Sequence, residues 1–169
     1  SKSRGSVENV SSADNDFDFY PWHFSNRYGY LSNHRRHWVK LNGFFNLEGD
    51  WTIAFDAFWN SPFTWTPYEN RADNAEVPYG RHFLEPRGSR EADSEYQLDL
   101  QLAKGFTTGG VRFVLIASVL NVTSSEQPSS VCEHISGCGA SEEGVPIAMG
   151  DAIEWQLPRR YELGFRVEF

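Results

Sequence analysis

The chain has 169 residues, a formal net charge of −8 and a sequence pI near 5.1, which argues against nucleic-acid binding because that function normally needs a basic surface. Hydrophobic residues make up 40% and aromatic residues 15% of the chain. No apolar run approaches the roughly 20 residues of a membrane-spanning helix. The chain starts at Ser1 without a recognisable signal peptide, so we expect that a leader has been removed or that this is a piece of a longer protein.

Five segments alternate apolar and polar residues with period two, which predicts β-strands. The fourth segment is blurred, because Val114, Ile116 and Leu120 stand where polar residues are expected. None of the segments has a convincing helical period. The predicted strands cover residues 37–48, 51–60, 94–106, 111–122 and 160–169.

The connections between these strands alternate in length. Gly49-Asp50 and the sequence "TTGG" predict two tight hairpin turns. The other two connections, residues 61–93 and 123–158, are much longer than is usual in compact domains. One edge of the sheet is therefore expected to carry tight turns and the other long loops, with the C-terminus on the tight-turn edge.

Alternation alone fits two architectures, a soluble antiparallel sheet over a core and a membrane-spanning β-barrel. Segments of about ten residues exceed the usual strand length and match a tilted strand that crosses a bilayer. Aromatic residues on the apolar side also fall at the strand ends, as in the girdles of outer-membrane barrels. They are Trp51, Phe106 and Phe169 at the tight-turn ends and Trp59, Tyr96 and Tyr161 at the long-loop ends.

The opposite side of the predicted strands carries many charges, which are costly against lipid but suit a hydrated lumen. Five strands cannot close a barrel that is wide enough for a polar interior, and an open sheet in a bilayer leaves backbone groups unpaired. We therefore expect a partial barrel wall. The charged residues are Lys40, Glu48, Asp56, Asp99, Arg112, Glu162, Arg166 and Glu168.

Several stretches together resemble the C-terminal quarter of TonB-dependent outer-membrane receptors. The similarity is greatest to the Oar-like branch, which has carboxypeptidase-regulatory-like N-terminal domains. It covers the chain from about Tyr28 onward, and the order of the stretches is more specific than any one of them. They are "YGYLSNHRRHWVKLNGFF", "GDWTIAFDAFWNSPFTWTPY", "PRGSREADSEYQLDLQLAKGF", "VLNV" and "PRRYELGFRVEF".

The resemblance implies an all-β, antiparallel transmembrane barrel of about 22 strands around a plug domain, with short periplasmic turns and long extracellular loops. Here residues 1–36 would be an extracellular loop segment, and residues 37–169 would hold the last five or so strands. The implied location is the outer membrane of a Gram-negative bacterium. The implied function is import of a ligand, with energy coupled through a TonB-type protein that contacts a plug missing from this chain.

The terminal strand resembles the signal that the outer-membrane barrel assembly machinery recognises. A free strand edge can be paired by another protein through its backbone groups. The residues that match the recognised pattern are Tyr161, Gly164, Val167 and Phe169.

Cys132 and Cys138 lie in the last long connection and are close enough in sequence to form a disulfide outside the cytoplasm. With His134 between them a zinc site is conceivable, but a fourth ligand is missing nearby. The disulfide is the favoured interpretation, and it would tie a loop tip without defining a function.

The stretch "HRRH", residues 34–37, stands at the expected outer rim near further arginines. Those arginines fit contacts to lipopolysaccharide phosphates, and they also fit a solvated rim, which we favour slightly. The sequon "NVT" at Asn121 is not expected to have a function in a bacterial outer-membrane protein.

The aromatic loops "DFDFYPWHF" and "SPFTWTPYEN" are the candidate ligand contacts, because exposed rings stack on sugars or peptides. The alternative is that the rings pack together and order the outer surface. No catalytic grouping, metal site or cofactor fingerprint is apparent, so we expect neither an enzyme nor a cofactor. The candidate contact residues are Tyr20, Trp22, Phe63, Trp65 and Tyr68.

The sequence thus favours a receptor wall with an unidentified ligand. A non-transporting adhesion or surface-binding barrel and, less favoured, a soluble β-sandwich binding module remain as alternatives. A plug and coupling box upstream would distinguish a transporter from an adhesin, and fold alone does not choose the substrate.

Overall fold

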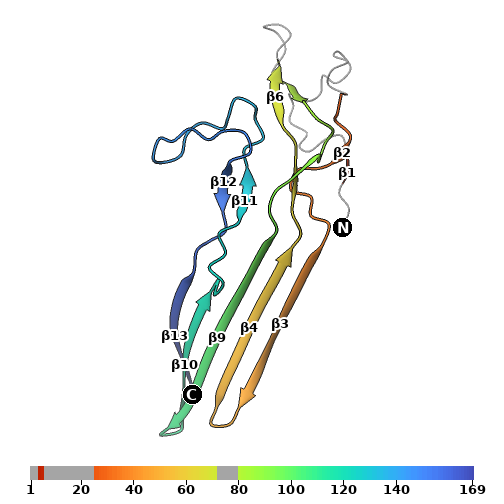
Figure 1. The fold of residues 1–169 in the computed structure, drawn as a ribbon. Helices are drawn as coiled ribbons and strands as arrows, with labels where there is room; N and C mark the ends of the chain where they lie inside the picture. The colour runs from red at the N-terminus through yellow and green to blue at the C-terminus, as the bar shows by residue number, and fades with distance from the viewer. Residues whose placement is uncertain (1–3, 6–24, 72–79) are drawn as a thin grey trace. The chain divides into compact units, whose positions relative to one another are not determined.

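A computed structural model describes residues 4–5, 25–71 and 80–169 of the chain (Figure 1). Across these residues the regular secondary structure is β-strand, and the paired strands are antiparallel. The predicted all-β, antiparallel fold is therefore confirmed. The described residues contain no helix of the length and apolar character needed to cross a membrane.

Five long strands form one sheet with the order β13-β10-β9-β4-β3, so strands that follow one another among these five are also neighbours in space (Figure 1). The sequence predicted all five. The third runs two residues further than expected, to Thr108, and the fourth ends at Leu120, because Asn121 leaves the strand with a φ of 52°. The strands are β3 (Trp38–Leu47), β4 (Trp51–Asn60), β9 (Glu95–Thr108), β10 (Val111–Leu120) and β13 (Arg160–Glu168).

Two tight turns join β3 to β4 and β9 to β10. Gly49 and Asp50 have φ values of 78° and 63°, and Gly109 and Gly110 have 58° and 81°. Left-handed conformations of this kind match the twist of hairpin strands, and they favour glycine, with Asp tolerated. The Gly-Asp and Gly-Gly dipeptides therefore suit tight turns, and the antiparallel pairing of β4 with β9 brings both turns to the same edge of the sheet.

The chain divides into two compact units that interleave along the sequence. The sheet unit contains residues 38–60, 95–127 and 156–169, and the loop unit contains the described residues within 1–37, 61–94 and 128–155. The loop unit thus combines the described part of the predicted segment 1–36 with most of the two long connections. Its short strands pair as β1 (Arg4–Gly5) with β2 (Gly29–Tyr30), β5 (Thr64–Trp65) with β8 (Arg90–Glu91), β6 (Tyr68–Arg71) with β7 (Gly80–Phe83), and β11 (Pro128–Val131) with β12 (Ala152–Trp155).

The two units differ in how they bury apolar groups. The loop unit has a small core of Phe63, Trp65 and Val131, against which Ala92 and Met149 pack. The sheet unit is a single layer of strands. Many of its large apolar side chains stay exposed, and Val114 is its one buried apolar side chain among the described residues, so the sheet unit has no core comparable to that of the loop unit.

Candidate functional site

One side of the sheet is apolar from edge to edge, and we call it the apolar face. Residues directly opposite one another on antiparallel strands point to the same side, and the register aligns the apolar set of every strand with that of its neighbour. For example, Phe55 of β4 pairs with Leu100 of β9, which pairs with Val119 of β10. The register places on this face Val39, Leu41, Gly43, Phe45 and Leu47; Trp51, Ile53, Phe55, Ala57 and Trp59; Tyr96, Leu98, Leu100, Leu102, Lys104 and Phe106; Phe113, Leu115, Ala117 and Val119; and Tyr161, Leu163, Phe165 and Val167.

Large side chains of the apolar face remain uncovered. Ile53 is 37% exposed, Leu115 54%, Phe165 78% and Leu163 89%. Five strands spaced about 4.8 Å apart, with eight residue steps of about 3.3 Å, give a face of roughly 600 Å² in projection. This projected area reaches the upper end of the size range found for the largest apolar patch on an ordinary soluble monomer. The surface area itself is larger, because the projection leaves out the relief of the side chains. A face of this size normally marks a surface that is covered in the working protein.

The aromatic residues on this face run obliquely across the strands. Trp51 and Trp59 of β4 are eight residues apart, and Tyr161 and Phe169 at the end of the chain have the same spacing. The register aligns Tyr161, through Val119 and Leu100, with Phe55 rather than with Trp59. The position of the aromatic residue at the long-loop end therefore shifts by four residues between β4 and β13, whereas Tyr96 of β9 lies directly opposite Trp59.

This shift corresponds to a strand tilt. Four residues are about 13 Å along a strand, and three strand spacings are about 14 Å across the sheet. If the aromatic residues at one end of the strands lie in a common plane, the strands tilt by roughly 40° from the normal to that plane. Closed barrels have strand tilts of about 35–45°.

A glycine on β3 makes room for an aromatic ring in the middle of the apolar face. A Cβ atom at Gly43 would lie 3.0 Å from the Phe55 ring, which covers the glycine and stacks on Phe45 with a centroid distance of 6.2 Å. Placing an aromatic ring over a strand glycine restores the packing that the missing side chain would otherwise provide. Phe55 is half-buried, whereas Ile53 and Leu100 beside it are exposed.

The opposite side of the sheet, which we call the polar face, is crossed by hydrogen bonds between strands. Thr52 Oγ1 donates to Asn46 Oδ1 at 3.0 Å, and Gln101 Nε2 donates to Ser118 Oγ at 3.2 Å. Apolar side chains also lie on this face: β10 contributes Val114, Ile116 and Leu120 beside Ser118, and β3 and β4 contribute Trp38, Phe44 and Phe58. The blurred pattern of β10 is therefore a real feature, and a partly apolar stripe crosses the polar face.

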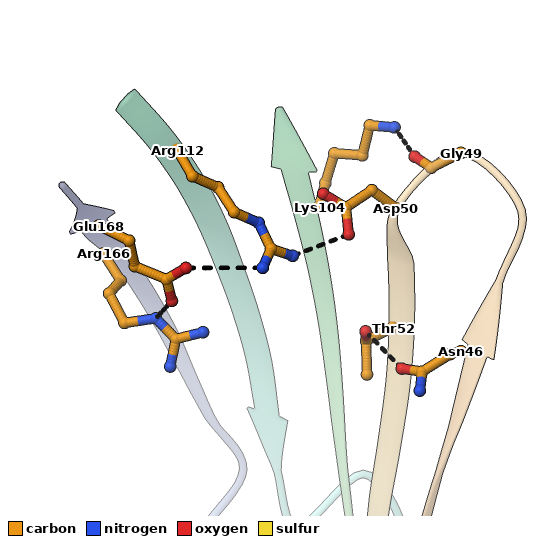
Figure 2. A network of polar contacts seen from close by, with 8 residues as sticks. All are labelled: Asn46, Gly49, Asp50, Thr52, Lys104, Arg112, Arg166 and Glu168. Carbon is orange, nitrogen blue, oxygen red and sulfur yellow. Dashed lines mark hydrogen bonds and ion pairs between the residues drawn. The ribbon is translucent and has the colours of Figure 1, made fainter. Parts of the chain in front are cut away.

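A charged network joins the strand ends on the polar face at the tight-turn edge (Figure 2). Arg112 on β10 lies between Asp50 and Glu168, with N–O distances of 2.8 Å and 3.5 Å. Arg166 Nε is 2.9 Å from the second oxygen of Glu168. Two acidic and two basic side chains neutralise one another in this arrangement and link the β3–β4 turn to β10 and β13.

Gly105 explains how Asp50 reaches Arg112 across β9. The backbone N–H of Gly105 donates to the Asp50 carbonyl at 2.9 Å, and a Cβ atom at this position would overlap the Asp50 carboxylate. A side chain here would displace Asp50 from Arg112. The glycine is therefore needed for the network.

Lys104 is the one charged residue among the residues that the register places on the apolar face. Its ammonium group lies 5.0 Å from the centroid of the Trp51 ring and donates to the carbonyl oxygen of Gly49 in the neighbouring turn (Figure 2). The aliphatic part of the side chain can thus stay on the apolar surface while the charge reaches the tight-turn edge, which is the behaviour called snorkelling.

Asn121 organises the other end of the sheet unit, where β10 leads into its loop. The residue is 1% exposed. Its side-chain amide donates to the carbonyls of Ser125 and Leu157, both at 2.9 Å, and its Oδ1 accepts from the Ser125 N–H at 3.1 Å. Asn121 is therefore a structural residue. An attached glycan has no room on this buried amide.

Three of the five candidate ligand contacts are among the described residues of the loop unit, and two of them are core residues. Phe63 is 1% and Trp65 is 7% exposed, because this unit buries its largest rings to form a core of its own. Neither ring offers a surface to a ligand. Tyr68 is half-buried between Phe83 and His134, with ring centroids 6.4 Å and 5.2 Å away. Tyr20 and Trp22 lie outside the described residues.

Arginines of the loop unit stack on these aromatic rings. Arg35 lies 5.1 Å from the Phe63 centroid, and Arg90 lies 5.0 Å from the Trp65 centroid. Arg90 also hydrogen-bonds Glu85, with Nη2 to Oε1 at 2.5 Å; this contact and a second one from Ser89 hold the pKa of Glu85 below its usual value. These arginines therefore help to order the loop unit itself.

The "HRRH" stretch does not form one site. His34 is buried and stacks on Tyr30 with a centroid distance of 4.6 Å, whereas Arg36 and His37 are exposed. Arg36 pairs with Glu91 at 3.3 Å. The side chains thus point to different surroundings.

The structure contains the Cys132–Cys138 disulfide, with Cys132 fully buried. His134 packs against Tyr68, and its Nδ1 accepts a hydrogen bond from the Ser136 N–H. Among the described residues no group of three or more His, Cys, Asp or Glu side chains is placed to hold a metal ion.

The four residues of the terminal pattern lie at an edge of the five-stranded sheet. Tyr161 and Val167 are on the apolar face, Gly164 is on the polar face, and Phe169, one residue after β13, is fully exposed. β13 pairs with β10 on one side only within the described residues. Its other backbone edge is therefore available to a further strand.

The sequence did not indicate Asp50 and Lys104 as special residues. Asp50 was recognised only as a turn residue, and Lys104 lay beyond the clearest part of its strand. The period-two count from Leu102 would have placed Lys104 on the apolar face, so a signal existed. The contact of Asp50 with Arg112 depends on strand pairing over 62 residues and had no local signal.

Protein-family models, curated proteins and solved structures were compared with the chain, and none of them matches it.

Proposed function

We propose that the five-stranded sheet is part of the wall of an outer-membrane β-barrel, with the apolar face toward lipid and the polar face toward the lumen. The observation that carries the proposal is the uncovered apolar face opposite a charged, hydrogen-bonded face. Lipid needs no protein layer over the first, and a hydrated lumen accommodates the second.

The dimensions of the apolar face support a bilayer as the covering material. Eight residue steps from Trp51 to Trp59 span about 26 Å along the strand, or about 19 Å along the membrane normal at a tilt of ~45°. The apolar band of outer-membrane barrels is about 25 Å tall. The four-residue shift of the aromatic level, which corresponds to a tilt of roughly 40°, supports the same interpretation.

In this proposal β3 and β13 pair with strands that this five-stranded sheet does not supply. Both are edge strands within the described residues, and unpaired backbone groups in hydrocarbon cost several kcal/mol each. The barrel is therefore completed by further sequence. As in the family that the chain resembles, the tight turns would face the periplasm and the long connections would be extracellular loops.

Within this class we propose a TonB-dependent receptor that binds and imports a ligand. The support is the resemblance of the ordered stretches described above, which also implies a plug that contacts a TonB-type protein. Tyr161, Gly164, Val167 and Phe169 would act earlier, as the signal for the barrel assembly machinery. Arginines of the loop unit are candidates for contact with lipopolysaccharide.

Membrane fractionation of the full-length protein tests the barrel part of the proposal. We expect the protein to sediment with outer membranes and to resist extraction at alkaline pH. Recovery in the soluble fraction would instead support a β-sandwich whose second layer covers the apolar face.

The receptor part needs a separate test, because an adhesin could use the same wall. We expect the full-length protein to contain a plug with a coupling box and to cross-link to a TonB-type protein through it. A barrel without either feature would support the non-transporting alternative.

A further inference from the structure

A shallow hollow on the apolar face lies where one small residue stands between larger ones. Ala117 on β10 pairs with Leu102 of β9 on one side and with Leu163 of β13 on the other. Leu115, in the next row of the apolar face, and Trp51 also line the hollow. Its surface is thus aliphatic, with one aromatic ring.

The hollow ends at Lys104. This residue lies directly between Trp51 and Leu115 in the register, one row closer to the tight-turn edge than Ala117. An ammonium group has three N–H donors. The contact with the Gly49 carbonyl therefore leaves donor capacity for a second acceptor at the mouth of the hollow.

An aliphatic depression that ends at a single cation fits an amphiphile with an apolar chain and an anionic head. We propose that this hollow binds an anionic phospholipid, with one acyl chain over Ala117 and the phosphodiester at Lys104. The proposal rests on the barrel-wall function and adds a lipid preference at one place on that wall. Lys104 is close to the tight-turn level, where the headgroups of one leaflet would lie.

A second copy of this sheet is a poorer occupant. If two apolar faces packed together, Lys104 would be buried against a face on which the register places no acidic side chain. A buried charge without a partner is strongly unfavourable. A phosphodiester supplies the missing negative charge. A single acyl chain is also narrow enough to lie in a depression that is one residue wide.

The test is native mass spectrometry of the intact protein in detergent, titrated with phosphatidylglycerol or phosphatidylcholine. We expect one phosphatidylglycerol to be retained with about fivefold preference over phosphatidylcholine, which is the contribution of one lysine near a membrane surface. Lys104→Gln should remove that preference. Lys40→Gln is the matched control, because Lys40 also lies over a tryptophan, 4.4 Å from the Trp38 ring, but on the polar face.

A second pair of variants tests the hollow itself without changing the charge. Ala117→Phe fills the hollow and should abolish retention of the single phosphatidylglycerol, because its acyl chain then has no depression to occupy. Ala57→Phe is its control, because Ala57 also stands between two leucines, Leu41 and Leu98, on the apolar face but outside the hollow.

The lipid-site proposal is overturned if Lys104→Gln keeps the preference, if Lys40→Gln loses it to the same extent, or if Ala117→Phe leaves retention unchanged. Such a result would remove the lipid-site proposal and leave the barrel-wall proposal intact, provided that acyl chains still contact the apolar face. If no lipid contacts that face at all, the wall fails and the lipid site fails with it.

Discussion

Two adjacent substitutions on β13 test which side of the sheet meets lipid. The Phe165 side chain is on the apolar face and 78% exposed, and it lies four residues from Tyr161 and four from Phe169, midway between the two aromatic levels. Phe165→Arg would therefore place a charge near the bilayer midplane. Such a substitution costs about 2–4 kcal/mol in outer-membrane barrels.

Gly164→Arg adds the same side chain one residue away, on the polar face. A Cβ atom at Gly164 meets nothing within 4 Å, and Glu162 and Arg166 flank it on the same face with opposite charges. We expect a change within about 1 kcal/mol in the free energy of unfolding, because an exposed position on a hydrated face carries no lipid penalty. The first atom of the new side chain therefore meets no steric overlap with the described residues.

The assay is urea unfolding of the intact protein in phospholipid vesicles, with Tyr161→Arg as a depth control. A substitution near an interface costs about 0–1 kcal/mol, whereas a protein interior would not impose this gradient along one strand. Equal destabilisation by Phe165→Arg and Gly164→Arg would refute the assignment of the two faces. Equal costs at Phe165 and Tyr161 would refute lipid as the covering material.

Three further predictions concern the sheet unit. Asn121→Ala should destabilise the folded protein by about 2–4 kcal/mol in urea titrations, because it leaves the buried N–H and C=O of Ser125 and the Leu157 carbonyl without their amide partner; a loss below 0.5 kcal/mol would contradict this role. In an Asp50→Ala background, Gly105→Ala should lower the free energy of unfolding little further, because each substitution alone already breaks the contact with Arg112. Additive losses of unfolding free energy in a double-mutant cycle would contradict that coupling. Deletion of Phe169 should slow insertion into the outer membrane more than it lowers the stability of the inserted protein, and an unchanged insertion rate would count against an assembly role.

The strands and their faces could be predicted from the sequence because both depend on local alternation. Tyr161, Leu163, Phe165 and Val167 show it without interruption, and the structure places all four side chains on one face. The turns were equally predictable, since Gly109-Gly110 adopts the positive φ values that its composition favours.

β10 shows where local alternation stops being sufficient. Val114 and Ile116 are as apolar as Leu115, so the pattern alone could not assign the faces of this strand. The register assigns the faces of β10, because it pairs Leu115 with Lys104 of β9 and with Phe165 of β13. This information comes from the two neighbouring strands and not from β10 itself.

The loop unit was the least predictable part of the molecule. Phe63 and Trp65 have the composition of an exposed ligand contact, but their burial depends on Val131, more than sixty residues away. The contact between Asp50 and Arg112 has the same origin, because long-range strand pairing brings the two residues together. Neither arrangement leaves a periodic signal in the sequence.

The central claim is that hydrocarbon covers the apolar face, and a pair of spin labels on β9 tests it most directly. Leu100 is on the apolar face of this central strand, and Gln101, the next residue, is on the polar face. In the intact protein in vesicles, we predict that a label at residue 100 is accessible to oxygen and protected from a water-soluble nickel chelate, and that a label at residue 101 is less accessible to oxygen. A label at residue 100 that is accessible to the nickel chelate, or protected from both reagents, would contradict the claim, because it would report water or packed protein instead of acyl chains.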